Sequence, residues 1–150
     1  MKIGVANDHR GYYLKKEIYN YIHELGYSCV DYGTNDDSSV DYVDYAVKLC
    51  KGINDGEVDI GILICGTGIG MSIAANRFKG IRCAKVDNPD EAIHTRNDND
   101  TNVIAFGEKM ELNKAILSVE AFINTDYSYL EKHERRNKKV RQIESGEFHG

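Results

Sequence analysis

One stretch, residues 58–78, constrains the fold of this chain more than any other. It begins with a nearly continuous apolar run at 58–64, passes through C-G-T-G-I-G at 65–70, and ends with helix-forming residues at 71–78. A continuous apolar run is typical of a strand buried on both faces of a parallel sheet. The apolar spacing of the last part is helical. The stretch therefore predicts a strand, a glycine-rich loop and a helix in direct succession.

The loop of this stretch has the composition of an anion site. A glycine at every second position lets successive backbone N–H groups converge, and the helix that follows adds the positive end of its dipole. Cys65 ends the strand, where the same field favours the thiolate form of its side chain. The glycines do not have the G-x-G-x-x-G spacing of a dinucleotide site, and the G-K-[ST] of a Walker loop is absent. We therefore expect a loop that holds an anion beside a reactive sulfur.

The remainder of the chain alternates between strand and helix patterns. Strands are expected at 2–6, 28–32, 58–64, 81–86 and 102–106, and helices at 12–25, 42–53, 71–78, 90–96, 112–123 and 131–143. This alternation predicts a single α/β domain over 1–150, with a three-layer, doubly wound (Rossmann-like) five-stranded parallel sheet. Ligands of such sheets bind beyond the carboxyl ends of the strands. The loops expected there are 7–11, 33–41, 65–70, 87–89 and 107–110.

Composition excludes several classes of function. The net charge of −5 argues against a nucleic-acid partner. No apolar run approaches 18 residues and no signal-peptide pattern is present, so we expect no membrane role and a cytoplasmic protein. The four cysteines have no close pairing such as C-x-x-C, which argues against a zinc site or disulfide framework. No metal and no other cofactor is expected, and Cys29, Cys50 and Cys83 are interpreted as buried free thiols.

Three polar groups outside the loop are candidates for chemistry. Asp8 and His9 follow the first strand and face the same rim as Cys65, although such residues also serve as surface or capping groups. The polar run 98–102 precedes the last strand, where it forms either a plain turn or a substrate-binding segment. Lys132 and Arg136 are four residues apart in the basic final helix, so they form either a solvated face or a grip for phosphate. Since that helix follows a complete core, we expect it to pack on a second subunit.

Several motifs together resemble one enzyme family. They are D-H-x-G at 8–11, D-x-G-T at 31–34, V-D-Y at 40–42, the run 64–76 with C-G-T-G-x-G and S-I-A-A-N, and N-D-T-N-V at 99–103. On these residues, over nearly the whole chain, the protein resembles the sugar-phosphate isomerases that include type B ribose-5-phosphate isomerase and the galactose-6-phosphate isomerase subunits.

The resemblance implies metal-independent aldose–ketose interconversion through a cis-enediolate, with ribose 5-phosphate and ribulose 5-phosphate as the first expectation. It assigns proton transfer between C2 and C1 to Cys65 and proton transfer between the two oxygens to Thr67. It also implies a homo-oligomer, a dimer or tetramer, that shares its active sites between subunits. The implied substrate-binding residues are Asp8, His9, Asp41, Tyr42, Gly66, Gly68, Ile69, Gly70 and Asn99, and the implied phosphate-binding residues are His9, Lys109, Lys132 and Arg136.

Departures from the family pattern leave the sugar open. Asp98 stands where ribose isomerases carry a histidine that opens the furanose ring, and it is the candidate for that catalytic role. Lys109 and Lys132 stand in place of arginines and lose their bidentate geometry. The alternatives are a hexose 6-phosphate of galactose or allose type, and a tetrose 4-phosphate, whose esterified O4 cannot close a furanose. A non-catalytic sugar-phosphate-binding protein is the alternative of another class.

Overall fold

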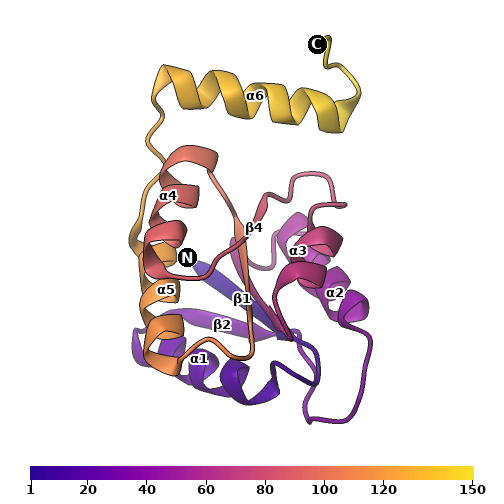
Figure 1. The fold of residues 1–150 in the computed structure, drawn as a ribbon, viewed down its shortest axis with the longest axis vertical. Helices are drawn as coiled ribbons and strands as arrows, with labels where there is room; N and C mark the ends of the chain where they lie inside the picture. Colours follow the sequence, from indigo (N-terminus) through magenta and orange to yellow (C-terminus); the bar gives the residue numbers. More distant parts are fainter.

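The computed structural model describes residues 1–150 as a three-layer α/β domain with a helix standing at one end (Figure 1). The strands are β1 (Lys2–Asn7), β2 (Ser28–Asp31), β3 (Ile60–Cys65), β4 (Cys83–Lys85) and β5 (Val103–Gly107), and the helices are α1 (Tyr12–Glu24), α2 (Tyr42–Asn54), α3 (Ile69–Ala75), α4 (Pro89–Asn99), α5 (Leu112–Asn124) and α6 (Glu131–Ser145). No helix is both long and apolar enough to cross a membrane.

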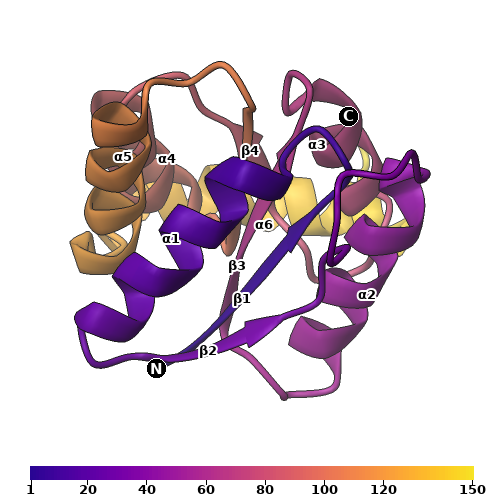
Figure 2. The same cartoon turned by 90° about the horizontal axis from the view of Figure 1, so that it is seen from below.

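All five strands are parallel, in the order β2-β1-β3-β5-β4. Figure 2 shows α1, α4 and α5 on one face of the sheet and α2 and α3 on the other. The doubly wound, five-stranded fold that the sequence predicts is confirmed. The chain leaves β1 toward β2 on one side and continues with β3 on the other, so the switch point lies between β1 and β3, where doubly wound sheets bind ligands.

Each face of the sheet buries its own core because side chains alternate along the strands. Ile3 and Val5 of β1 pack under α1 and α5, with Phe106 of β5 among their neighbours. Ala6 of β1 and Leu63 of β3 face α2 and α3 instead. β3 is buried along its whole length, as expected for the central strand of a sheet covered on both sides.

Several of the predicted boundaries are wrong, including those of β3, β4 and α3. The central strand is Ile60–Cys65 and β4 shrinks to Cys83–Lys85. α3 is Ile69–Ala75, and not 71–78, because Gly68 takes a left-handed conformation with φ +84° and starts the helix directly after the loop.

The polar run at 98–102 is not the plain turn considered from the sequence. α4 continues through Asn99, and Asp100 then adopts a left-handed φ of 51° as its C-cap. Asn88 begins this helix by accepting the Glu91 N–H, and Arg96 secures its end by donating to the Thr101 carbonyl at 2.6 Å. These contacts keep a polar segment helical although only Ala92 and Thr95 are buried.

A buried lysine supports the first crossover of the fold. Lys15 of α1 is only 3% exposed, and its Nζ donates to Asp31 Oδ2 at 2.7 Å and to the Thr34 carbonyl at 3.2 Å. The ammonium therefore joins α1 to the end of β2 and to the turn that follows it.

α6 lies apart from the two helical layers, across the end of the domain (Figures 1 and 2). Asn137 attaches it by donating to the Asp98 carbonyl and the Tyr127 hydroxyl, both at 2.9 Å. A groove of about 630 Å³ separates α6 from the α3 and β4 side of the domain. Val140 and Ile143, which line this groove, are 54% and 64% exposed.

Candidate active site

The predicted glycine loop lies at the carboxyl end of β3, between the ends of β1 and β5. Cys65 is 5% exposed, and its Sγ accepts the Gly68 N–H at 3.1 Å. The N–H groups of Gly66 and Thr67 donate to no group of the chain, so they are available to an oxygen of a ligand. A sulfur and unpaired amides therefore lie on one loop, and proton abstraction and oxyanion binding use groups of these two kinds.

Close backbone packing determines the course of this loop. A Cβ on Gly68 would lie 2.7 Å from the Phe106 Cα, and a Cβ on Gly107 would lie 2.9 Å from the Gly66 carbonyl oxygen. The Glu108 N–H donates to the Cys65 carbonyl at 2.9 Å. The loop is thus held against β5 by backbone contacts that only glycine permits. Thr67 Oγ1 accepts the Ile69 N–H at 3.2 Å, and both side chains are exposed at the rim.

Asp8 and His9 lie at the end of β1 beside this loop, as the sequence predicts. Asp8 is 5% exposed, and its Oδ1 accepts the N–H groups of Arg10 and Gly11 at 2.9 and 3.2 Å. The His9 Nδ1 accepts the Val40 N–H at 3.2 Å. A neutral His9 ring therefore carries its proton on Nε2, where it can donate to a ligand.

Asp41 and Tyr42 reach the same rim from the start of α2. Asp41 is the N-cap residue, but its carboxylate makes no capping hydrogen bond. The Tyr42 ring packs against Gly70, since a Cβ there would lie 2.7 Å from the Tyr42 Cζ. Lys109, in the turn after β5, is exposed and has no ion-pair partner in the chain.

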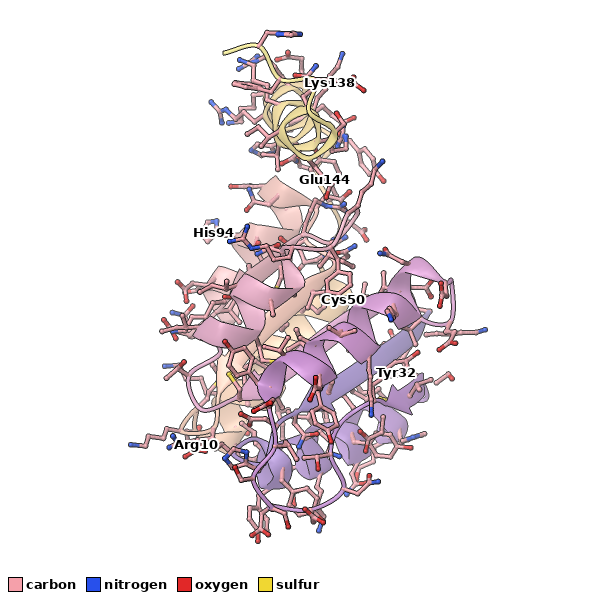
Figure 3. The ribbon with its side chains drawn as sticks, turned by 90° about the vertical axis from the view of Figure 1, so that its right-hand side faces the viewer. Arg10, Tyr32, Cys50, His94, Lys138 and Glu144 are labelled. Atoms are coloured by element: carbon pink, nitrogen blue, oxygen red, sulfur yellow. The ribbon has the colours of Figure 1, made fainter.

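Four of the predicted site residues do not join this group within one chain. Asp98 and Asn99 form the last turn of α4, and Lys132 and Arg136 lie on α6. α4 ends where the chain is about to enter β5, so these residues lie at the amino edge of the sheet, opposite Cys65. Figure 3 shows Arg10 in the lower part of the molecule and Lys138 and Glu144 of α6 in the upper part.

A histidine that sequence reasoning missed lies beside Asp98. His133 of α6 is 7% exposed, its Nδ1 contacts the Ser128 Oγ at 2.6 Å, and its Nε2 lies 3.5 Å from Asp98 Oδ1. Asn97 donates to the same carboxylate oxygen at 2.7 Å. His133 and Asn137 are the two buried residues of α6 and lie four positions apart, so they share the face that touches the domain. Both are polar, so the sequence carries no signal that distinguishes this face.

The other cysteines differ from Cys65 in their surroundings. Burial raises the pKa of the Cys29 thiol to about 12 and that of Cys50 to about 11, and it raises the pKa of Cys83 further still. Each has a raised pKa because desolvation disfavours the thiolate. All three are free thiols, and Cys29 and Cys50 are buried as the sequence predicts, whereas the prediction is wrong for Cys83, which is only partly buried. Cys65 is the cysteine placed at a loop of free N–H groups.

Known proteins resemble this chain along almost its whole length. The family model for Ribose/Galactose Isomerase matches residues 3–140. Ribose-5-phosphate isomerase B of Escherichia coli (strain K12) is 42% identical over 146 residues, 95% of this chain and 96% of that protein.

Solved structures of the same group superpose closely. Ribose-5-phosphate isomerase B of Clostridium thermocellum has a TM-score of 0.94 at 41% identity, covering 97% of this chain and 99% of that one. The Mycoplasma genitalium ribose-5-phosphate isomerase B with bound ribulose 5-phosphate has a TM-score of 0.90 at 32% identity, covering 96% of each chain. The similarity thus includes the sheet, the glycine loop and α6.

Proposed function

Because the chain belongs to the ribose/galactose isomerase family, we propose that it interconverts ribose 5-phosphate and ribulose 5-phosphate. Membership makes it a sugar-phosphate isomerase, an enzyme that exchanges an aldose and a ketose. The pentose is supported by the Escherichia coli relative, named for that sugar, and by the Mycoplasma genitalium neighbour that binds ribulose 5-phosphate. The observation that carries the proposal is the Cys65 sulfur held beside the unpaired N–H groups of Gly66 and Thr67.

The reaction proceeds in three proton transfers, two at carbon and one between the two oxygens. Cys65, as thiolate, removes the proton from C2 of the open-chain aldose, and the electron pair moves to give a cis-enediolate. The free loop amides stabilise the negative oxygen that forms. Thr67 passes a proton between O1 and O2, and Cys65 returns its proton to C1 to give the ketose. Every proton taken is returned, so the step needs no metal and no redox partner.

The substrate lies across the rim described above. Asp8 and Asp41 accept hydroxyl protons of the sugar, and Tyr42, Ile69 and Gly70 border the chain of carbons. His9 and Lys109 bind the phosphate at the far end.

A second copy of the chain completes the site. Asp98, Asn99, Lys132 and Arg136 collect around α6, and the exposed Val140 and Ile143 make the adjoining groove apolar on one side. In a symmetric dimer each copy offers the same surface to the other. We infer that α6 and the end of α4 lie against the Cys65 loop of the partner subunit. There α4 contributes Asp98 and Asn99, with Asp98 taking part in ring opening, and α6 contributes Lys132 and Arg136, which bind phosphate.

Complementation tests the shared site directly. The variants Cys65→Ala and Arg136→Ala are each expected to be inactive. Mixing and reassociating them restores about a quarter of wild-type turnover, because half the dimers are mixed and each mixed dimer has one intact site. Recovery of no activity, from partners shown to exchange subunits, would refute the shared arrangement.

The substrate is tested with a panel of aldose phosphates. The ratio kcat/KM is measured for ribose 5-phosphate, galactose 6-phosphate, allose 6-phosphate and erythrose 4-phosphate, with and without EDTA. The highest value is expected for ribose 5-phosphate, unchanged by EDTA. A higher value for a hexose phosphate or for the tetrose phosphate would make that sugar, and not ribose 5-phosphate, the substrate. Loss of activity in EDTA would contradict metal independence. Binding without turnover would favour a non-catalytic sugar-phosphate-binding protein.

A further inference from the structure

A second cavity is lined by residues of the same rim, among them an arginine, Arg10, that has not yet been given a role. It has a volume of about 430 Å³ and lies between the loop after β1, the start of α1 and the turn after β5. His9 and Lys109, the two phosphate residues of this rim, both line it. Arg10 also lines it, so the cavity has three groups suited to an anion.

The carboxylates of this cavity are already engaged. Asp37 accepts the Tyr13 hydroxyl at 3.2 Å. Glu108 receives the Arg10 guanidinium in a bidentate pair, with Nε to Oε2 at 3.0 Å and Nη2 to Oε1 at 3.1 Å. The unpaired groups are therefore Lys109 and the Nε2 of His9, and Arg10 is held ready by a single acidic partner.

The Arg10–Glu108 pair is exchangeable. The side chain of Arg10 is 54% exposed and that of Glu108 is 24% exposed, and exposed ion pairs contribute little to stability. A phosphate monoester carries a second negative charge and three oxygens, so it competes well for a guanidinium fork. The pairing raises the pKa of Arg10 through its hydrogen bond to Glu108, so Arg10 stays charged throughout.

Arg10 also reaches the catalytic loop. A Cβ on Gly66 would lie 3.3 Å from the Arg10 Cδ and 3.4 Å from its Nη1. Nη1 has no hydrogen-bond partner in the chain. One guanidinium thus lies within reach of both the free loop amides and the cavity that Lys109 and His9 line.

We propose that Arg10 binds the substrate phosphate by exchanging Glu108 for it. This inference rests on the proposed function, since it assigns the phosphate end of that substrate. Lys109 offers phosphate only a point charge, and Arg10 supplies a bidentate fork on the same rim. In the absence of substrate, the Glu108 carboxylate takes the place of phosphate at the Arg10 guanidinium and keeps that side chain oriented. Because Glu108 competes with the substrate phosphate for Arg10, it also weakens phosphate binding.

The experiment measures inorganic phosphate binding by calorimetry, together with kcat and KM for ribose 5-phosphate. Arg10→Ala is expected to raise the phosphate Kd and the KM roughly tenfold, with kcat little changed. Glu108→Gln is expected to lower both constants, because it removes the competing charge. The double variant should behave like Arg10→Ala, since Glu108 acts only through Arg10. Lys16→Ala, which removes an exposed cation of α1 outside the cavity, is the matched control and should leave both constants unchanged.

Opposite effects of the two single variants distinguish a ligand from a structural pair. If the Arg10–Glu108 pair only stabilised the fold, each single variant would have a lower midpoint of unfolding, and both would bind phosphate with the affinity of the wild type. The proposal is overturned if Arg10→Ala binds phosphate as the wild type does, or if Glu108→Gln weakens binding as Arg10→Ala does. If one of these two results is found while the wild type still turns over ribose 5-phosphate, the proposed isomerase function stands and only the role of Arg10 is refuted. A wild type that neither turns over ribose 5-phosphate nor binds phosphate would refute both proposals.

Discussion

Gly68 makes the most specific connection between the fold and the catalytic loop. Its φ of +84° belongs to the left-handed region, and an added Cβ would lie 2.7 Å from the Cα and 2.9 Å from the backbone N and C of Phe106. Gly56 has a similar φ of +78°, but nothing lies within 4 Å of its Cβ position. Replacing each with alanine therefore separates the cost of the backbone conformation from the cost of the close approach.

The two variants should differ in a measurable way. Gly56→Ala incurs only the left-handed conformation and is expected to lower the free energy of unfolding by about 1 kcal/mol. Gly68→Ala adds a clash with the backbone of a buried strand, so the expected loss is about 2–4 kcal/mol. Since the clash also pushes the loop amides away from the substrate, kcat should fall about 10²-fold, as when an oxyanion donor is lost.

Urea unfolding and turnover of ribose 5-phosphate test this expectation. Both variants are measured beside the wild type, and Gly56→Ala should retain wild-type turnover. If Gly68→Ala loses no more stability than Gly56→Ala and keeps its kcat, then the loop is not held against β5 in the way described.

Three further changes have defined outcomes. Lys15→Met leaves Asp31 and a turn carbonyl without their ammonium, so the free energy of unfolding from urea titration should fall by about 2–3 kcal/mol; an unchanged value would contradict the buried pair. The hydrogen bond that Tyr21 donates to Glu120 raises the pKa of the phenol from 10.0 to about 12, so its stabilisation is complete below pH 10 and is lost as pH rises through 12. The stability difference between wild type and Tyr21→Phe should shrink over that interval, and a difference that grows there would refute the assignment. Asp98→Asn should reduce turnover of ribose 5-phosphate about 10²-fold but spare erythrose 4-phosphate, which has no furanose ring to open; an equal loss on both sugars would exclude a ring-opening role.

The sheet and the glycine loop were predictable because their signals are local. Apolar runs at strands and helical spacing between them alternate along the chain, and only a doubly wound sheet accommodates that alternation. The spacing of Gly66, Gly68 and Gly70 likewise predicts the amide-lined turn, since left-handed conformation and close approach both require glycine. Cys65, Asp8 and His9 follow from the rule that strand ends meet at one edge.

The remaining features depend on contacts that leave no local pattern. Glu108 is 98 residues from Arg10, so no window of sequence contains both members of the pair. The continuation of α4 through the polar segment that contains Asp98 is stabilised by contacts of Arg96 with the Thr101 and Thr125 carbonyls, and not by helix propensity. The burial of His133 depends on how α6 meets α4, and the basic residues around it suggest a fully solvated helix.

The central claim is that Cys65 moves the proton between the two carbons, and exchange in D₂O tests it most directly. Proton NMR would follow ribose 5-phosphate with the wild type, Cys65→Ala and Cys65→Ser at equal concentration. The account predicts deuterium at the carbon next to the carbonyl together with ribulose 5-phosphate for the wild type, and a loss of about 10³-fold for both variants. Exchange by Cys65→Ala at the wild-type rate would contradict it, and the base would then have to be another group at this rim.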